Sequence, residues 1–208
     1  MRFRTRLVAI YPAMIILSVF LSQFCPTSAS SDTVGDAIKS AKNGDYQRAI
    51  PVLEMAVKDD NPAAAIVLGL MYEFGDGVPQ SFQRAMELYA IASRGGINAA
   101  NFNIGEMYLQ GHGVSVDYQR ALQWFRQGAA LGHPLAQFRL AIMHQRGLGV
   151  PQNAANAHVW YSLAVAGGYQ DAETFRDELL RQFDKDQTRL AQETVENCMA
   201  SNLIDCPY

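Results

Sequence analysis

Four histidines are the side chains of this 208-residue chain best suited to bind a metal or to act as a catalytic base. His112 lies in a glycine-rich loop and His133 in a turn, whereas His144 and His158 fall in apolar stretches with helical spacing. No two of them are four residues apart on one helix, and no His-Glu-x-x-His motif occurs. We therefore expect neither a metal site nor a cofactor.

No nucleophile stands in a sequence context that is typical of catalysis. The chain has no Gly-x-Ser-x-Gly motif and no glycine-rich phosphate loop followed by a lysine. Three Gly-x-Gly motifs, at 75–77, 111–113 and 147–149, each follow a helical stretch. They are explained by the positive φ that glycine allows at the end of a helix. The sequence therefore predicts a protein that is not an enzyme.

The first 29 residues have the features of a cleaved signal peptide. Three arginines precede an apolar run over 7–21, and small residues follow it. This order of a basic segment, an apolar segment and a small-residue cleavage site is typical of export. We expect cleavage after Ala29 or Ser30 and a periplasmic or secreted protein.

Two alternatives to cleavage remain open. A retained membrane anchor is disfavoured because the apolar run contains Pro12 and is shorter than the ~20 residues of a spanning helix. A lipoprotein attached at Cys25 is disfavoured because Phe24 stands where such a signal has a small residue. We therefore expect no membrane insertion after cleavage.

The charge of the mature chain argues against nucleic acid as a partner. The predicted signal carries three arginines and no acidic residue, so its removal changes the formal net charge from −3 to −6. No cluster of Lys and Arg is interleaved with aromatic residues, as nucleic-acid-binding surfaces require.

Cys198 and Cys206 are the two cysteines that remain after cleavage. A metal site would need two further ligands at suitable spacing, and none is close in sequence. Because an exported protein meets an oxidising compartment, we predict a disulfide between them. Two free thiols are the alternative.

A period of 36 residues organises the rest of the chain. The segment 105–140 matches the residues 36 positions before and after it in one register without a gap. Each unit has a first helix (62–74, 98–110 or 134–146), a Gly-x-Gly-Val loop and a second helix. The second helices are predicted to begin near Ser81, Asp117 and Asn153.

Neither helix of a unit can bury its apolar side alone, so the units must stack side by side. The sequence predicts an all-α solenoid with a signal peptide (1–29), a degenerate N-terminal capping repeat (31–61), three repeats (62–172) and a C-terminal helical cap (173–208). The repeats span about 62–97, 98–133 and 134–172. Small residues such as Gly69, Gly105 and Ala121 are expected where the two helices of a unit cross.

The pattern from Ala100 to His133, with Gly-x-Met-Tyr, Gly-x-Gly-Val, Ala-x2-Trp-Phe and Gly-His in order, resembles the Sel-one-like repeat, a relative of the tetratricopeptide repeat. The resemblance covers 62–172 closely and 36–61 loosely. Two departures are His144 in place of tyrosine and Leu88 in place of tryptophan. The resemblance implies an α/α solenoid that holds a partner protein or peptide on a concave face. Exported bacterial members are similar to regulators of envelope signalling and to secreted factors that engage host or cell-surface proteins.

The candidate partner-binding residues follow from the helical period. They lie on the side of the first helices opposite the expected core. The set is Glu73, Phe74, Phe102, Glu106, Gln110, Phe138, Gln145 and Arg146. Surface exposure is expected for four of them: Glu73, Glu106, Gln110 and Arg146. For Phe102 and Phe138 the alternative is packing between neighbouring first helices.

The leading hypothesis is an exported, non-enzymatic scaffold that binds a protein or peptide. The first alternative is an envelope hydrolase, or an accessory subunit of an enzyme that acts on peptidoglycan or peptide. The second is self-association along the solenoid, because the sequence leaves the oligomeric state open.

Overall fold

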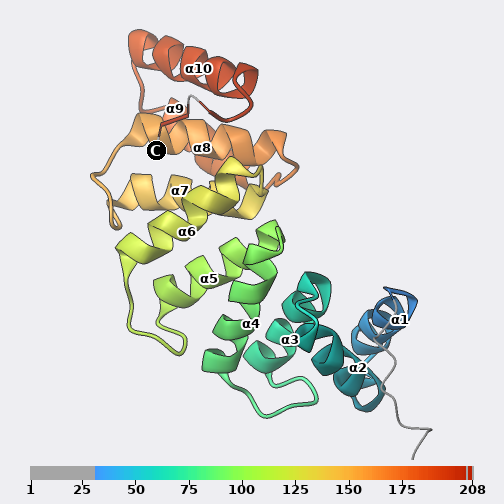
Figure 1. The fold of residues 1–208 in the computed structure, drawn as a ribbon. Coiled ribbons are helices and arrows are strands. Elements are labelled where there is room, and N and C mark those ends of the chain that lie inside the picture. Colours follow the sequence, from blue (N-terminus) through green and yellow to red (C-terminus); the bar gives the residue numbers. More distant parts are fainter. Residues whose placement is uncertain (1–30, 205, 208) are drawn as a thin grey trace, which may run out of the picture.

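The computed structural model describes residues 31–204, 206 and 207, so the predicted signal peptide lies outside the described residues. This part of the chain is all-α and forms ten helices, which lie in chain order along one elongated stack with α1 at one end and α10 at the other (Figure 1). They are α1 (Ser31–Lys42), α2 (Tyr46–Lys58), α3 (Pro62–Phe74), α4 (Phe82–Arg94), α5 (Asn98–Gln110), α6 (Tyr118–Ala130), α7 (Pro134–Arg146), α8 (Ala154–Ala166), α9 (Ala172–Leu180) and α10 (Lys185–Ala200). None of the described helices is both long and apolar enough to cross a membrane.

Polar side chains begin the second helices where the sequence predicts. The side chains of Ser81, Asp117 and Asn153 each accept a hydrogen bond from the backbone N–H three residues on. Such a cap satisfies one of the N–H groups that a helix start leaves without a partner. At the other end, Gly111 closes α5 with φ of 78°, a left-handed conformation in which a Cβ would be strained. The predicted helix–loop–helix units are confirmed.

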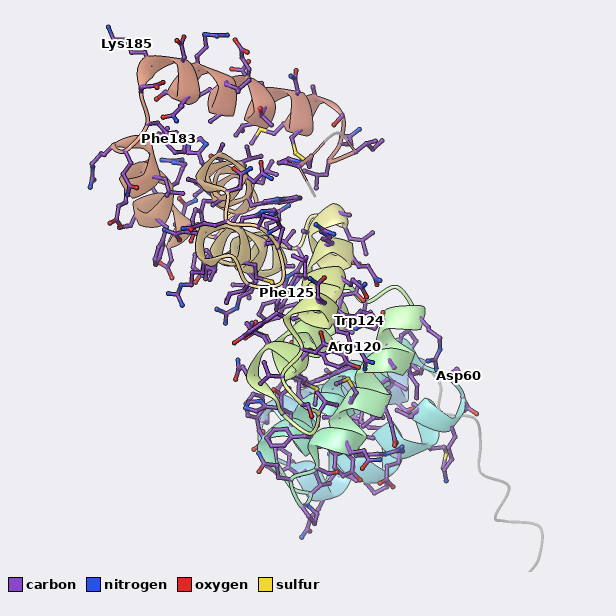
Figure 2. All side chains as sticks on the ribbon, turned by 90° about the vertical axis from the view of Figure 1, so that its left-hand side faces the viewer. Asp60, Arg120, Trp124, Phe125, Phe183 and Lys185 are labelled. Carbon is purple, nitrogen blue, oxygen red and sulfur yellow. A yellow bond between two sulfur atoms is a disulfide. The ribbon has the colours of Figure 1, made fainter. Side chains whose placement is uncertain are left out.

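Close contact between the two helices of a unit depends on a missing side chain. A Cβ on Gly69 would lie 2.6 Å from a ring carbon of Tyr89, and one on Gly105 would lie 2.5 Å from a ring carbon of Phe125. Both rings are fully buried. Figure 2 shows Phe125 among the packed helices, whereas Asp60 and Lys185 lie at the edge of the molecule. The prediction that small residues occupy the helix crossings is confirmed.

Each glycine loop also packs against the preceding unit. A Cβ on Gly77 would lie 2.3 Å from Cβ of Tyr46, and one on Gly113 would lie 2.6 Å from Cβ of Phe82. The Phe82 ring also stacks on His112, with 4.6 Å between the ring centroids. An aromatic first residue of a second helix therefore supports the loop of the next unit. The corresponding residue of α8, which no such loop follows, is Ala154.

Within each unit, the first residue of the first helix meets the turn after the second helix, and this junction follows a second pairing rule. A Cβ on Gly95 would lie 2.3 Å from Cβ of Pro62, and one on Gly167 would lie 3.0 Å from Cγ of Pro134. In the middle unit Asn98 replaces the proline and Leu131 replaces the glycine, and Asn98 Nδ2 donates to the Leu131 carbonyl at 3.2 Å. The proline ring therefore requires glycine at the junction, whereas asparagine allows a larger residue.

The last two helices cover the end of the solenoid. Both α9 and α10 pack against α8. A disulfide joins Cys198 to Cys206, as predicted, and the Trp160 indole N–H donates to the Pro207 carbonyl at 2.9 Å. Within the predicted cap (173–208), α9 ends at Leu180, because Asp184 begins α10 with a capping box that needs a turn before it.

Candidate partner-binding surface

We call nine residues in the last two turns of α3, α5 and α7 the first-helix face. They occupy equivalent positions in three successive units, 36 residues apart. The nine include six of the eight predicted partner-binding residues, that is, all of them except Phe102 and Phe138. The nine are Leu70, Glu73, Phe74, Glu106, Leu109, Gln110, Ile142, Gln145 and Arg146. Whether this face is concave stays a prediction.

The α3 part of the face is apolar and exposed. Phe74 is 66 % exposed and Leu70, one helical turn earlier, is 37 % exposed. Because residues four apart lie on the same side of a helix, the two form one apolar strip. Phe74 belongs to the predicted partner-binding set, and Leu70 does not.

The α5 part of the face is a fixed ion pair. Arg139 of α7 donates from Nε to Oε1 of Glu106 at 2.6 Å and from its terminal nitrogen to Oε2 at 2.8 Å. The Glu106 side chain is only 12 % exposed, so the expectation that it is a freely exposed acid is wrong. The two-point contact satisfies both carboxylate oxygens and links two units.

Sequence reasoning missed Arg139, although a signal was present. In the next unit Ile142 occupies the position equivalent to Glu106, 36 residues later. Arg139 lies three residues before Ile142, which is about one helical turn. Opposite charges at that spacing can meet between adjacent first helices. Gln110 completes the arrangement, because its amide nitrogen donates to Oε2 of Glu106 at 2.8 Å.

Two further residues of the face are held by tyrosines of the second helices. The Tyr89 hydroxyl donates to Glu73 Oε2, and the Tyr161 hydroxyl donates to Gln145 Oε1 at 2.6 Å. Burial, and then the Glu73 carboxylate, raise the pKa of Tyr89. Burial raises the pKa of Tyr161 to about 12. Both phenols are therefore protonated donors at neutral pH.

Two of the three phenylalanines of the predicted set, Phe102 and Phe138, pack inward. Phe138 is 9 % exposed, and the rings of Tyr161, Tyr169 and Phe175 surround it. Phe102 stacks on His133, with 5.3 Å between the ring centroids, and its ring lies tilted against that of Phe125 at 6.0 Å. Phe138 is therefore packed inside the protein, against α8 and α9 rather than between neighbouring first helices. Its assignment to the open surface is wrong, because the C-terminal cap covers it.

The α7 part of the face opens into a pocket of about 410 Å³. Gln145 and Arg146 line one side of it, and Phe175 and Glu178 of α9 line the other. Arg146 is exposed, and none of the ion pairs found among the described residues engages it. This end of the face therefore offers a positive charge beside an aromatic ring.

Three of the four histidines either cap a helix or lie buried in the fold. His133 caps α7, because its Nδ1 accepts a hydrogen bond from the Ala136 N–H at 3.3 Å. His144 and His158 are buried, and burial lowers the pKa of each. Within the described part of the chain no three His, Cys, Asp or Glu side chains gather as metal ligands would.

Comparison with known proteins identifies the repeat. The Sel1 repeat matches residues 62–97, 98–133 and 134–169, which is half of the chain. No curated protein matches.

Two solved structures share the fold. A Sel1 repeat protein from Oxalobacter formigenes is 25 % identical with a TM-score of 0.68, over 84 % of this chain and 79 % of that one. The protective antigen c5321 of uropathogenic Escherichia coli, which displays an SLR fold, is 25 % identical with a TM-score of 0.73. That alignment covers 85 % of this chain but 40 % of the antigen, so the chain spans about two fifths of its length. The three matched repeats and the stacked helix pairs show that the chain belongs to the Sel1 repeat family.

Proposed function

We propose that this protein is an exported, non-enzymatic scaffold that binds a protein or peptide on the first-helix face. Sel1 repeats typically build protein-interaction scaffolds. The observation that carries the choice of face is the exposed strip of Leu70 and Phe74, since a phenylalanine that is 66 % exposed gains most from a partner that covers it.

The polar part of the face supports the same choice. The Glu106–Arg139 pair, Glu73 and Gln145 are already fixed by hydrogen bonds. A partner that meets fixed side chains does not lose the free energy needed to order them. Binding therefore rests on the apolar strip and on Arg146, and the ion pair holds α5 and α7 in position.

The partner segment has a defined chemistry. It places an apolar side chain on Leu70 and Phe74 and a carboxylate near the exposed guanidinium of Arg146. Carboxylates are well matched by the planar donors of arginine. The apolar strip and Arg146 lie in the first and third units, so the segment spans more than one repeat.

Selection of binding peptides from a displayed library by the mature chain tests the site. Phe74→Ser should weaken the selected peptides by about tenfold or more, because burial of an aromatic side chain contributes ~1.5–3 kcal/mol. Leu131→Ser is the matched control, since Leu131 is 56 % exposed but lies at the turn after α6. Equal loss in both variants, or loss in the control alone, would overturn the proposed face.

Export is tested separately by the mass of the protein that a bacterial host delivers to its periplasm or medium. Because residues 1–29 contain a basic, an apolar and a small-residue segment in order, the exported protein should have the mass of the chain without about 29 N-terminal residues. Recovery of the intact chain in the membrane fraction would favour the anchor instead.

A further inference from the structure

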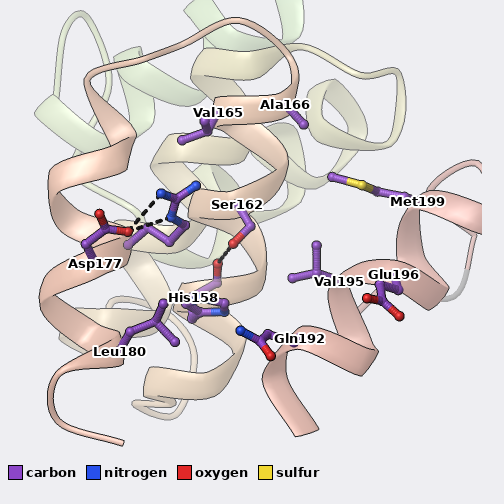
Figure 3. Close-up of a pocket in the computed structure, with 11 residues that line it drawn as sticks. His158, Ser162, Val165, Ala166, Asp177, Leu180, Gln192, Val195, Glu196 and Met199 are labelled. Atoms are coloured by element: carbon purple, nitrogen blue, oxygen red, sulfur yellow. Dashed lines mark hydrogen bonds and ion pairs between the residues drawn. The ribbon is translucent and has the colours of Figure 1, made fainter. Parts of the chain in front are cut away.

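A second pocket, of about 600 Å³, lies away from the first-helix face between α8, α9 and α10. Its floor is one stripe of α8, from His158 through Ser162 to Ala166. Figure 3 shows Asp177 and Leu180 of α9 on one side of this floor and Val195, Glu196 and Met199 of α10 on the other. The pocket is therefore a trough along a helix with two separate walls.

The floor contains a buried polar group without a partner. His158 is 3 % exposed, and its Nδ1 makes no hydrogen bond. Its ring lies at one end of the trough between Leu180 and Gln192 (Figure 3). Burial, and then the charge of Arg176, lower the pKa of His158, so the ring is neutral at pH 7 and adds no positive charge to the pocket.

The charges that line the trough leave a net negative site. Arg176 donates to Asp177 Oδ1 at 2.8 Å and to Glu173 Oε1 at 3.1 Å, so two carboxylates already engage its guanidinium. Glu196 lines the same trough, and no hydrogen bond or ion pair found among the described residues engages its carboxylate. A cation therefore finds a free acceptor here, whereas an anion finds no free donor of positive charge.

The walls are suited to an aliphatic chain that carries such a cation. Val165 on the floor and Val195 and Met199 on the α10 wall are apolar, and Met199 is 43 % exposed. The stripe from His158 to Ala166 is about 12 Å long at 1.5 Å per residue, which exceeds a single side chain. A basic side chain that buries its methylenes and keeps its head at an acid uses a surface of this kind.

We propose that the trough between α8, α9 and α10 binds a guanidinium or ammonium group on an aliphatic chain, with the cation at Glu196 and the chain along Val165, Val195 and Met199. The proposal is independent of the first-helix face, because none of these residues belongs to it.

Titration of the ¹⁵N-labelled mature chain, followed by amide NMR shifts, tests the proposal. The probes are n-butylguanidinium and, as the anion of similar length, pentanoate. The guanidinium should shift the amides of Gln192, Glu196 and Met199, and pentanoate should not. Equal shifts from pentanoate, or guanidinium shifts confined to other helices, would overturn the proposed ligand class.

Matched variants of α10 sharpen the test. Glu196→Gln should weaken n-butylguanidinium by about tenfold, the usual effect of losing one charge-assisted hydrogen bond. Glu193→Gln is the control, because Glu193 lies on the same helix but pairs with Arg189 and does not line the trough. Unchanged binding in Glu196→Gln, with native thermal unfolding, would contradict the role of Glu196.

A capped tripeptide, acetyl-Ala-Arg-Ala-amide, distinguishes the source of the cation. Tighter binding of the tripeptide than of n-butylguanidinium assigns the trough to a basic peptide segment. Equal binding assigns it to a free amine or guanidine. Both results support the cation site, and binding of neither probe would refute it.

Discussion

The hydroxyl of Tyr161 donates a hydrogen bond of 2.6 Å to Oε1 of Gln145, sixteen residues earlier in the same unit. The same bond joins Tyr89 to Glu73 two units earlier. In the middle unit the equivalent positions hold Phe125 and Leu109, an apolar pair. The residue on the first helix and the residue on the second helix therefore differ together between units, as a polar pair or as an apolar pair. This is expected of two side chains that touch each other.

This relationship predicts that the pairs can be exchanged as units. Tyr89→Phe should lower the free energy of unfolding by about 1 kcal/mol, because it removes a hydrogen bond from the half-buried Glu73. Adding Glu73→Leu, which recreates the Phe125–Leu109 pair, should recover most of the loss. Urea unfolding of the two single variants and the double variant measures the coupling. Strictly additive effects would show that the bond does not stabilise the fold.

The junction rule makes a second prediction. Gly95→Leu should destabilise the fold by about 1–3 kcal/mol through overpacking, since the new Cβ would lie 2.3 Å from Cβ of Pro62. Pro62→Asn in the same chain should relieve it, because Asn98 and Leu131 already coexist at this junction in the middle unit. Thermal unfolding of the three variants is the measurement, and a double variant no more stable than Gly95→Leu would contradict the rule.

Protonation of the buried His144 should lower the free energy of unfolding in mild acid. His144 is 1 % exposed, neither ring nitrogen has a hydrogen-bond partner, and burial followed by the charge of Arg126 lowers its pKa from 6.5 to about 4. The folded state therefore binds this proton more weakly than the unfolded state, so the contribution of His144 is complete above pH 6.5 and falls as the pH approaches 4. At 1.36 kcal/mol per pKa unit the loss is about 3 kcal/mol.

His144→Tyr isolates that contribution, because Tyr72 and Tyr108 occupy the equivalent positions. Urea unfolding at pH 7 and at pH 4 should show a smaller decrease for the variant than for the wild type. His133 and His158 also have lowered pKa values, so part of the decrease remains in both proteins. An identical decrease would assign the acid sensitivity to other groups.

The disulfide should stabilise the C-terminal cap. Closing the short loop between Cys198 and Cys206 is worth about 2–3 kcal/mol in the chain-entropy account. Replacing both cysteines by serine should remove this amount and free the chain near Pro207, whose carbonyl accepts the Trp160 N–H. The fluorescence emission of Trp160 should then move to longer wavelength. Ser201→Ala is the control, because this variant keeps the disulfide. Unchanged stability and emission would contradict this role.

The repeat made most of the architecture predictable. Glycine pairs and capping residues recur every 36 positions, so helix ends such as Gly111 and starts such as Asp117 could be located from sequence. The environment of a side chain between units could not. Phe138 looked exposed by its helical phase, but α9 brings Phe175 over it, and α9 lies outside the repeat. Glu106 looked free because its partner Arg139 belongs to the next unit.

The most direct test of the central claim is photocrosslinking in the native compartment from single sites of the full chain. A benzophenone side chain replaces Phe74 on the first-helix face or, as the control, Leu131 at the turn after α6. The account predicts that one partner protein crosslinks from position 74 and not from position 131, and that Arg146→Glu reduces its yield. A partner captured only from position 131, or equally from both positions, would contradict the assignment of binding to the first-helix face.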